Sequence, residues 1–325
     1  ARTGQPPAPN GRYAWHGAPD GGATFPARDG GWVYVSNAEL RDGAGGVGAL
    51  RFDRTGRVVD AYPILAGTAV NCAGGPTPWG TWLSCEEFPR GRVWECDPFG
   101  RRAAVVRPAL GVFQHEAVAV DPRDGRLYLT EDVPDGCFYR YTPARRVRGV
   151  PDLERGVLEA ARVGDDGSVQ WLRVEDPSYA SASTRAQVPE ATRFAGGEGC
   201  WHAAGHVWFT TKRDDRVWRY ATATGRLAIV YDRATSATPL SGVDNVTVMP
   251  RGDALVAEDG GDMQLVVVAP DGRAAPLLQV AGHERSEVTG PAFSPDGRRL
   301  YFSSQRGASG RNEDGTTYEV SGPFG

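Results

Sequence analysis

One stretch of the sequence reads His206-Val207-Trp208-Phe209-Thr210, then a short polar turn, then Arg216-Val217-Trp218-Arg219-Tyr220. Large apolar residues alternate with polar ones in both segments, which is the pattern of a half-buried β-strand. Because the turn between them is short, we interpret the stretch as an antiparallel hairpin. This hairpin predicts a small antiparallel sheet.

The same unit of apolar strand, Gly- or Asp-containing turn and apolar strand recurs along the chain. Asp-Gly turns at 124–125, 271–272 and 296–297 mark several copies. Six copies at roughly 40–60-residue spacing favour an all-β fold, a six-bladed β-propeller in which each blade is a small sheet. Five or seven blades remain alternatives. The six units begin at Gly31, Thr81, Arg126, His206, Ala254 and Arg299.

The composition agrees with a turn-rich β protein. The chain has 325 residues with 43 Gly and 24 Pro, which disfavour long helices. A net charge of −4 argues against electrostatic capture of nucleic acid, and no run approaches the ~18 apolar residues that span a bilayer. We expect a single propeller domain over residues 1–325, with an irregular insertion at 143–195 that contains a possible short helix at 151–159.

Two features of the composition bear on the cellular location. The chain starts at Ala1 without an apolar leader, as expected of a mature secreted or periplasmic protein. Its five cysteines are an odd number, so at least one is unpaired within the chain, while Cys72 and Cys200 are candidates for a disulfide. Lys212 is the only lysine, which we attribute to codon bias.

Acidic residues recur at the ends of the predicted strands, one or two in each unit. In a propeller such positions converge around the central channel, where repulsion between so many carboxylates would require cations. Oxygen ligands suggest calcium, and a thiolate among them suggests a transition metal. Alternatively, each acid is a turn or capping residue, and Cys85 a small buried hydrophobic residue. The acids are Glu39, Glu86, Glu87, Glu116, Glu131, Asp132, Glu198, Asp244, Glu258 and Asp259.

The longest distinctive motif is Asn71-Cys72-Ala73-Gly74-Gly75-Pro76-Thr77-Pro78-Trp79-Gly80-Thr81-Trp82-Leu83-Ser84-Cys85-Glu86-Glu87. Further motifs are Phe113-Gln114-His115-Glu116-Ala117, Gly197-Glu198-Gly199-Cys200-Trp201, Val243-Asp244-Asn245 and Glu258-Asp259-Gly260. On these motifs, most of the chain resembles the PhoX-type alkaline phosphatase family.

The resemblance implies a six-bladed propeller, export by the twin-arginine route, and a centre of ferric iron and calcium ions on the propeller axis. It implies that Cys85 binds iron and that Cys85, Glu116 and Glu198 are catalytic as well as metal-binding. Asn37 and Glu39 match the family's Asn-x-Glu strand end. The full set of expected metal ligands is Glu39, Cys85, Glu86, Glu116, Asp132, Glu198, Asp244, Glu258 and Asp259.

The sequence departs from the family at the third glutamate. Longer members carry Arg-Pro-Glu there, and the arginine contacts phosphate, whereas this chain has Gly196-Gly197-Glu198. Lys212 and Arg193 are expected to replace the missing cation, and Asn37 is a third expected substrate contact.

The sequence therefore predicts an exported, monomeric, metal-dependent phosphatase that hydrolyses a small phosphate monoester and has no nucleic-acid or membrane partner. Metal ions suit this reaction because they neutralise the phosphoryl oxygens. Two alternatives remain. One is an enzyme that uses the same metals on a non-phosphate substrate, and the other is a non-catalytic propeller with structural calcium.

Overall fold

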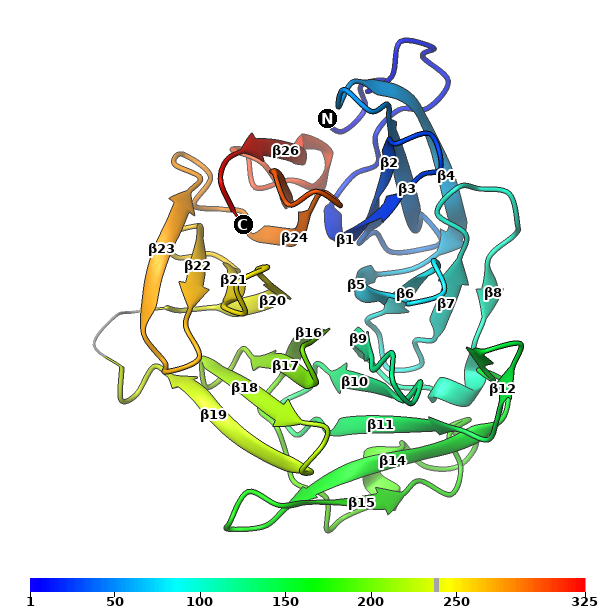
Figure 1. The fold of residues 1–325 in the computed structure, drawn as a ribbon, viewed down its shortest axis with the longest axis vertical. Helices are drawn as coiled ribbons and strands as arrows, with labels where there is room; N and C mark the ends of the chain where they lie inside the picture. The colour runs from blue at the N-terminus through cyan, green and yellow to red at the C-terminus, as the bar shows by residue number, and fades with distance from the viewer. Residues whose placement is uncertain (237–239, 325) are drawn as a thin grey trace.

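The computed structural model describes residues 1–236 and 240–324, and six of its sheets are arranged around a common centre (Figure 1). The predicted six-bladed, all-β propeller is confirmed. Every predicted hairpin supplies the second and third strands of one blade. The first strand of each blade lies innermost, so β1, β5, β9, β16, β20 and β24 surround the centre.

The strands of the six blades are as follows. Blade 1 contains β1 (Pro19–Pro26), β2 (Trp32–Ala38), β3 (Gly45–Phe52) and β4 (Val58–Thr68), and blade 2 contains β5 (Asn71–Pro76), β6 (Trp82–Glu86), β7 (Val93–Cys96) and β8 (Val105–Val106). Blade 3 contains β9 (His115–Val120), β10 (Leu127–Glu131), β11 (Phe138–Pro143), β14 (Gly156–Val163) and β15 (Val169–Arg173). Blade 4 contains β16 (Gly197–Ala203), β17 (His206–Thr211), β18 (Arg216–Ala221) and β19 (Arg226–Asp232). Blade 5 contains β20 (Val243–Val248), β21 (Ala254–Glu258), β22 (Gln264–Val268) and β23 (Ala274–Gln279), and blade 6 contains β24 (Val288–Phe293), β25 (Arg299–Ser304) and β26 (Thr316–Ser321).

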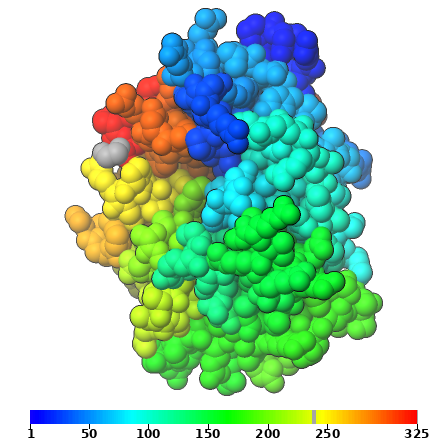
Figure 2. Space-filling model, turned by 45° about the vertical axis from the view of Figure 1, so that its right-hand side comes forward, coloured from blue at the N-terminus to red at the C-terminus, as the bar shows by residue number. Residues whose placement is uncertain are grey.

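The predicted insertion at 143–195 is only partly irregular. Its strands β14 and β15 are the outer strands of blade 3, which forms the broad lower end of the molecule in Figure 2. The short helix predicted at 151–159 is wrong, because β14 pairs with β11 and buries Leu158 and Ala160 on alternate positions. A small ribbon of β12 (Arg146–Val147) and β13 (Val150–Pro151) precedes them. No helix in the described ranges is long and apolar enough to cross a bilayer.

Blade 6 has three strands, and the start of the chain extends it. Arg2 bridges Thr316 in antiparallel fashion, and Thr317 exchanges backbone hydrogen bonds with Ala1 at 2.8 and 2.9 Å. The start of the chain accordingly lies near β26 (Figure 1). This pairing closes the ring, since the N-terminal residues lie against the outermost strand of the last blade.

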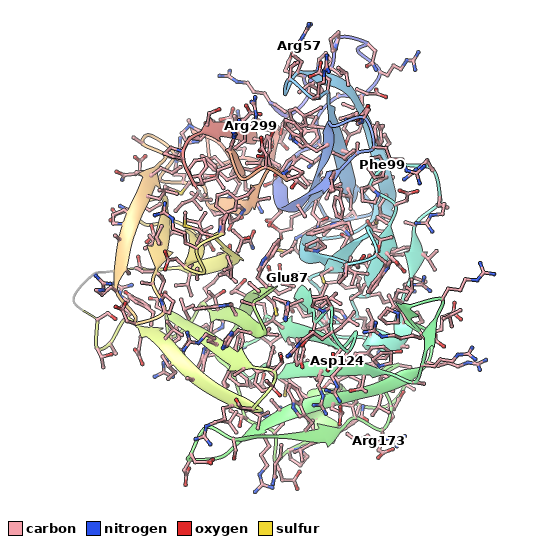
Figure 3. The ribbon with its side chains drawn as sticks, viewed as in Figure 1. Arg57, Glu87, Phe99, Asp124, Arg173 and Arg299 are labelled. Carbon is pink, nitrogen blue, oxygen red and sulfur yellow. The ribbon has the colours of Figure 1, made fainter. Side chains whose placement is uncertain are left out.

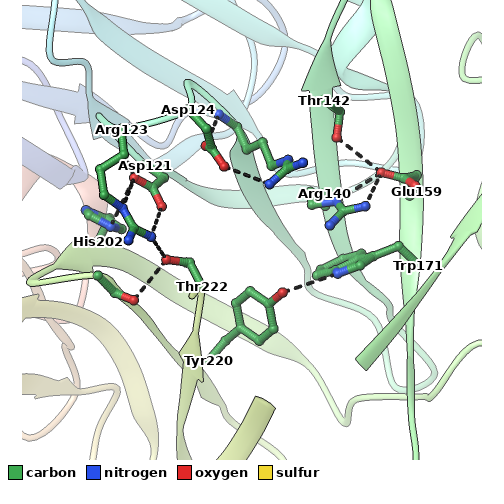
Figure 4. Close-up of polar contacts among 12 residues, drawn as sticks. Asp121, Arg123, Asp124, Arg140, Thr142, Glu159, Trp171, His202, Tyr220 and Thr222 are labelled. Carbon is green, nitrogen blue, oxygen red and sulfur yellow. Dashed lines mark hydrogen bonds and ion pairs between the residues drawn. The ribbon is translucent and has the colours of Figure 1, made fainter. Parts of the chain in front are cut away.

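Aromatic and polar contacts join blades 3 and 4 at their outer ends (Figure 4). Trp171 of β15 donates its Nε1–H to the Tyr220 hydroxyl of β18 at 3.3 Å. The Arg140 guanidinium lies 4.5 Å from the Trp171 ring and pairs with Glu159 at 2.8 Å. The first contact joins the two blades, and the contacts of Arg140 hold Trp171 in place within blade 3.

Each innermost strand has a β-bulge near its start, where its register against the second strand shifts. Such bulges bend a strand and redirect a side chain. Because all six blades share the bulge, the residue within it occupies an equivalent position in every blade. The shifts lie between Pro19 and Gly22, Asn71 and Gly74, His115 and Val118, Gly197 and Cys200, Val243 and Val246, and Thr289 and Ala292.

Small residues within the bulge allow the innermost strands to approach one another closely. A Cβ added to Gly21 would lie 2.5 Å from the Cα of Ala73 in the next blade. A Cβ added to Gly199 would lie 2.7 Å from the Cα of Asn245. Both neighbours are backbone atoms, so neither can rotate away. The tight centre of the propeller therefore depends on these glycines.

We expect Gly199→Ala to lower the free energy of unfolding by about 1–3 kcal/mol, as overpacking does in other cores. Denaturant titration measures this loss. Gly80→Ala is the control, because Gly80 lies in a turn at φ +84° with nothing within 4 Å of an added Cβ, and it reports the cost of backbone strain alone. If Gly199→Ala unfolds at the same denaturant concentration as the wild type, the packing argument is contradicted.

Candidate metal centre

In each innermost strand, the residue directly after the start of the register shift lies in the bulge. In five blades this residue is a potential metal ligand, and each is at most 7% exposed. Gly290 has the equivalent position in blade 6. The fold therefore brings one ligand-type side chain from each of five blades to the centre of the ring. The five are Asp20, Cys72, Glu116, Glu198 and Asp244.

A second set of polar side chains reaches the same centre from the residue that follows the second strand of each blade. Figure 3 shows one of them, Glu87, near the centre of the ring. Four members of this set are acidic and one is basic. They are Glu39, Glu87, Asp132, Lys212 and Asp259, which follow β2, β6, β10, β17 and β21.

Blade 6 contributes differently. Gln305, just after β25, donates its side-chain N–H groups to Asp20 Oδ2 at 2.6 Å and to Glu39 Oε2 at 2.7 Å. Glu287 precedes β24 and is 6% exposed. Blade 6 therefore supplies an amide that orients two acids of blade 1 and one further carboxylate.

The ligand atoms form a continuous arc. Among the described residues, four groups of three have ligand atoms within 4.8 Å of one another, and neighbouring groups share Cys72, Glu116 or Asp244. The groups are Asp20–Glu39–Cys72, Cys72–Glu87–Glu116, Glu116–Glu198–Asp244 and Asp244–Asp259–Glu287. An arc of this length has room for more than one cation.

Burial and mutual repulsion raise the pKa values of these groups. Burial, followed by the charges of Glu39 and Asp132, raises the pKa of Glu87 to about 8. Burial raises the pKa of Asp244 to about 7, although Lys212 acts in the opposite direction. Without cations, the cluster would hold protons at neutral pH. Burial also raises the pKa values of Asp20, Glu39, Cys72, Glu116, Glu198 and Glu287.

The donor set at this centre fits metal ions. Glu116 Oε2 and Asp132 Oδ1 are buried and have no hydrogen-bond partner. The Cys72 thiol donates a hydrogen bond to Glu116 Oε1 at 3.3 Å. Among the described residues, no hydrogen-bond donor to this sulfur is found, so a thiolate here would need a cation. Buried lone pairs without donors are satisfied by cations. Carboxylate oxygens suit calcium, and a thiolate suits a softer metal.

Two basic side chains lie at the mouth of the centre. Lys212 Nζ is 3.1 Å from Glu198 Oε1 and 3.3 Å from Asp259 Oδ2. Arg306 pairs with Glu287 at 2.8 Å and with Asp259 Oδ1 at 3.4 Å. Their side chains are 32% and 29% exposed, so both remain accessible to a ligand in solution.

The structure brings a different cysteine to the centre than the sequence predicted. Cys85 lies inside β6, fully buried among Leu83 and Val93 in the hydrophobic core between blades 2 and 3. It belongs to none of the ligand groups in the described residues. The structure therefore does not bring Cys85 to the centre, as the sequence predicted, and places the thiol of Cys72 there instead.

Consecutive acids at strand ends divide between two tasks, because neighbouring residues of a strand point to opposite sides. Glu86 accepts the backbone N–H of Arg92 at 3.2 Å, and Glu258 accepts that of Gln264 at 3.0 Å. Both therefore stabilise the turn of their own blade. The structure does not bring Glu86 and Glu258 to the centre, as the sequence predicted. Their neighbours Glu87 and Asp259 lie there instead.

Two of the predicted substrate contacts lie elsewhere. Asn37 is fully buried, accepts the Trp82 indole N–H at 2.9 Å and donates to the Ala73 carbonyl at 2.7 Å, so it joins blades 1 and 2. Arg193 donates to the Cys137 thiol at 2.8 Å. Neither side chain belongs to the centre, and both predictions are corrected on this ground. Lys212 is the one predicted substrate contact that the structure places there.

The structure thus brings together some of the predicted residues and adds others. The predicted residues at the centre are Glu39, Glu116, Asp132, Glu198, Lys212, Asp244 and Asp259. Those that the sequence reasoning missed are Asp20, Cys72, Glu287, Gln305 and Arg306, whereas Glu87 was among the expected acids of the channel but not among the expected metal ligands. A signal for two of them exists, since a ligand-type residue followed by Gly or Ala repeats in Asp20-Gly21, Cys72-Ala73, Glu116-Ala117 and Glu198-Gly199.

Solved structures of several proteins share this fold. Pseudomonas fluorescens PhoX in complex with vanadate, a transition state analogue, superimposes with a TM-score of 0.77 at 16% identity, over 98% of this chain and 93% of that chain. A gluconolactonase from Xanthomonas campestris gives a TM-score of 0.54 at 14% identity, over 88% and 83% of the two chains. A chain of a nidogen–laminin complex gives 0.54 at 12% identity, over 90% and 95%. At such identities the likeness shows the fold alone.

The sequence itself shows the family. No curated protein matches it. The family model described as alkaline phosphatase PhoX, however, matches residues 35–227 and 204–307, which together cover most of the chain. These segments contain the bulges of blades 2 to 6 and most of the ligand arc. The chain therefore belongs to the PhoX alkaline phosphatase family.

Proposed function

We propose that this phosphatase releases phosphate from small monoesters at a centre of iron and calcium ions held by the ligand arc. The observation that carries the proposal is the arc itself: buried carboxylates and one thiol occupy equivalent positions of five blades, and two of their oxygens have no hydrogen-bond partner. The match to the alkaline phosphatase family supports the same reaction. The vanadate that is bound to the related Pseudomonas fluorescens protein is a transition state analogue, which also supports it.

The thiol indicates how the arc divides between the two metals. Cys72 belongs to the groups that also contain Asp20, Glu39, Glu87 and Glu116, and a thiolate ligand favours iron there. The groups without a thiol offer only carboxylate oxygens, which favour calcium. When bound, such ions neutralise phosphoryl oxygens and supply the Lewis acidity that attack on phosphorus requires.

The protein's own side chains have a separate part in binding the substrate. Lys212 and Arg306 are the basic residues at the mouth, where both are partly exposed and both pair with Asp259. A phosphate dianion is the ligand that such a pair attracts. Asp259 lies between the two cations, so an arriving phosphate group competes with a carboxylate for them. This competition favours a dianionic monoester over a diester with a single charge.

We extend the proposal to the protein's surroundings: it acts as a monomer in a secreted or periplasmic form. The family resemblance supports export. Light scattering of the purified protein tests the monomer, and cell fractionation tests the location.

The choice of substrate has a direct test. We expect the protein to hydrolyse p-nitrophenyl phosphate with a kcat/KM at least about 100-fold above that for bis-p-nitrophenyl phosphate, since the diester presents one charge fewer to Lys212 and Arg306. Release of p-nitrophenol gives both rates. Equal rates, or hydrolysis of a lactone with neither phosphoester cleaved, would contradict the proposal.

A further inference from the structure

Lys212 is the only lysine in a chain whose other basic side chains are all arginine. It lies at the position that is acidic in the neighbouring blades, namely the residue that follows the second strand. Asp132 has this position in blade 3 and Asp259 has it in blade 5. Blade 4 thus places a cation where its neighbours place a carboxylate.

The Lys212 ammonium lies among three carboxylates. Its Nζ is 3.1 Å from Glu198 Oε1 and 3.3 Å from Asp259 Oδ2, and Asp244 is the third acid that acts on it. Burial lowers the pKa of Lys212, but the charges of these three acids and of Glu287 outweigh burial and raise it. Three acids from blades 4 and 5 therefore surround one positive nitrogen.

The contact of the Lys212 ammonium with Glu198 indicates the role of this cation. The Glu198 side chain is 1% exposed, and among the described residues the cation that pairs with its Oε1 is the Lys212 ammonium, at 3.1 Å. The ammonium thus balances a buried carboxylate, as a metal ion would. An ammonium is a compact, nearly spherical cation, whereas a guanidinium is flat and needs paired acceptors. This difference explains why a lysine serves here in a chain that otherwise uses arginine.

We propose that Lys212 is a built-in cation whose ammonium takes the place of a metal ion between Glu198, Asp244 and Asp259. Its positive charge offsets one of the three carboxylate charges in this part of the arc, and this charge remains when metal ions are removed. Replacement of Lys212 by a neutral side chain leaves three convergent carboxylates, two of them buried, with no cation. Those carboxylates then form an additional site for a divalent ion such as calcium.

The experiment counts calcium ions. Wild-type and Lys212→Met protein, both stripped of metal, are titrated with calcium by equilibrium dialysis and calorimetry. We expect the variant to bind one more calcium ion per chain than the wild type, and calcium to raise its Tm by more. Arg213→Met is the matched control, because Arg213 is the adjacent residue, is exposed and makes no ion pair in the described structure. It should bind the wild-type number. Equal calcium binding by Lys212→Met and wild type would overturn the proposal.

A second variant covers the possibility that Lys212→Met does not fold in chelator. Calcium should then restore its folding. The double variant Lys212→Met with Asp259→Asn removes one carboxylate together with the cation, so it should fold in chelator and bind no extra calcium. If the double variant folds while calcium fails to rescue the single one, the proposal is wrong. It is equally wrong if neither variant folds in calcium, because the defect is then not one of charge.

The inference goes beyond the proposed phosphatase activity and fails separately from it. The metal content of the wild-type protein tests the centre. The difference in bound calcium between wild type and Lys212→Met tests the built-in cation.

Discussion

Cys72→Ala is expected to release iron from the protein and to lower kcat/KM for a phosphate monoester by more than about 100-fold, since even loss of a group that only supports a metal ligand costs about 10–100-fold. Cys72 is 7% exposed, and its Sγ belongs to two of the ligand groups. The measurement combines elemental analysis with the rate of ester hydrolysis.

Cys85→Ala is the matched control for this prediction. Cys85 is also buried, but it lies in the core between blades 2 and 3. Its replacement removes one sulfur atom from a packed core, which we expect to lower the free energy of unfolding by about 1 kcal/mol. Iron content and kcat/KM should stay close to wild type. The reverse outcome, with iron lost from Cys85→Ala and retained by Cys72→Ala, would show that the thiol has been misassigned.

Glu116→Gln is expected to have an effect of similar size. Glu116 is fully buried, joins two ligand groups and has one oxygen without a hydrogen bond. The amide keeps the shape of the side chain but carries no charge and presents an N–H where a metal would bind. We therefore expect loss of bound metal and a fall in kcat/KM of more than about 100-fold. In chelator the variant should be more stable than wild type, because burial and its acidic neighbours raise the pKa of Glu116.

Glu131→Gln separates this effect from the general cost of altering a buried acid. Glu131 is also fully buried, but it pairs with Arg185 at 2.9 Å and accepts the Tyr139 hydroxyl at 2.8 Å inside blade 3. We expect Glu131→Gln to lower the free energy of unfolding by about 1–3 kcal/mol and to retain its metal. A Glu116→Gln protein with full metal content and activity would remove Glu116 from the centre.

The repeat of the fold was predictable from the sequence, but the innermost strands were not. The second and third strands of each blade alternate apolar and polar residues and pack on both faces, so their pattern is clear. The innermost strands instead contain Gly, Pro and acidic residues, as in Pro19–Pro26 and Val288–Phe293. These residues are disfavoured in strands generally, and close approach at the ring centre explains their presence here.

Cys85 was predicted in place of Cys72 for the same reason, because Cys72 lies in an innermost strand. Both cysteines lie in one motif, and Cys85 is followed by two acids, which makes it the more conspicuous choice. Only the register shift between Asn71 and Gly74 turns Cys72 toward the axis. Arg306 and Glu287 were missed for a different reason. Both residues come from blade 6, which has three strands where the other blades have four or five. The repeated sequence pattern therefore does not predict them.

The outer strands of blade 3 were missed because their pattern is weak. Residues 156–173 contain many charged side chains, and only Leu158, Ala160 and Ala161 are fully buried. Pairing of β14 with β11, and of β15 with β14, supplies what the local pattern lacks. Tertiary pairing of this kind outweighs local propensity in β-sheets.

Metal content measured together with activity tests the central claim most directly. The protein should be purified without chelators and without a metal-affinity tag, and then assayed for iron, calcium and p-nitrophenyl phosphate hydrolysis before and after removal of metal. The account predicts iron and calcium in the active sample, loss of activity on stripping and recovery when both metals are restored. Full hydrolysis by protein that contains neither metal would contradict it, and calcium alone in a protein without activity would point to a non-catalytic propeller.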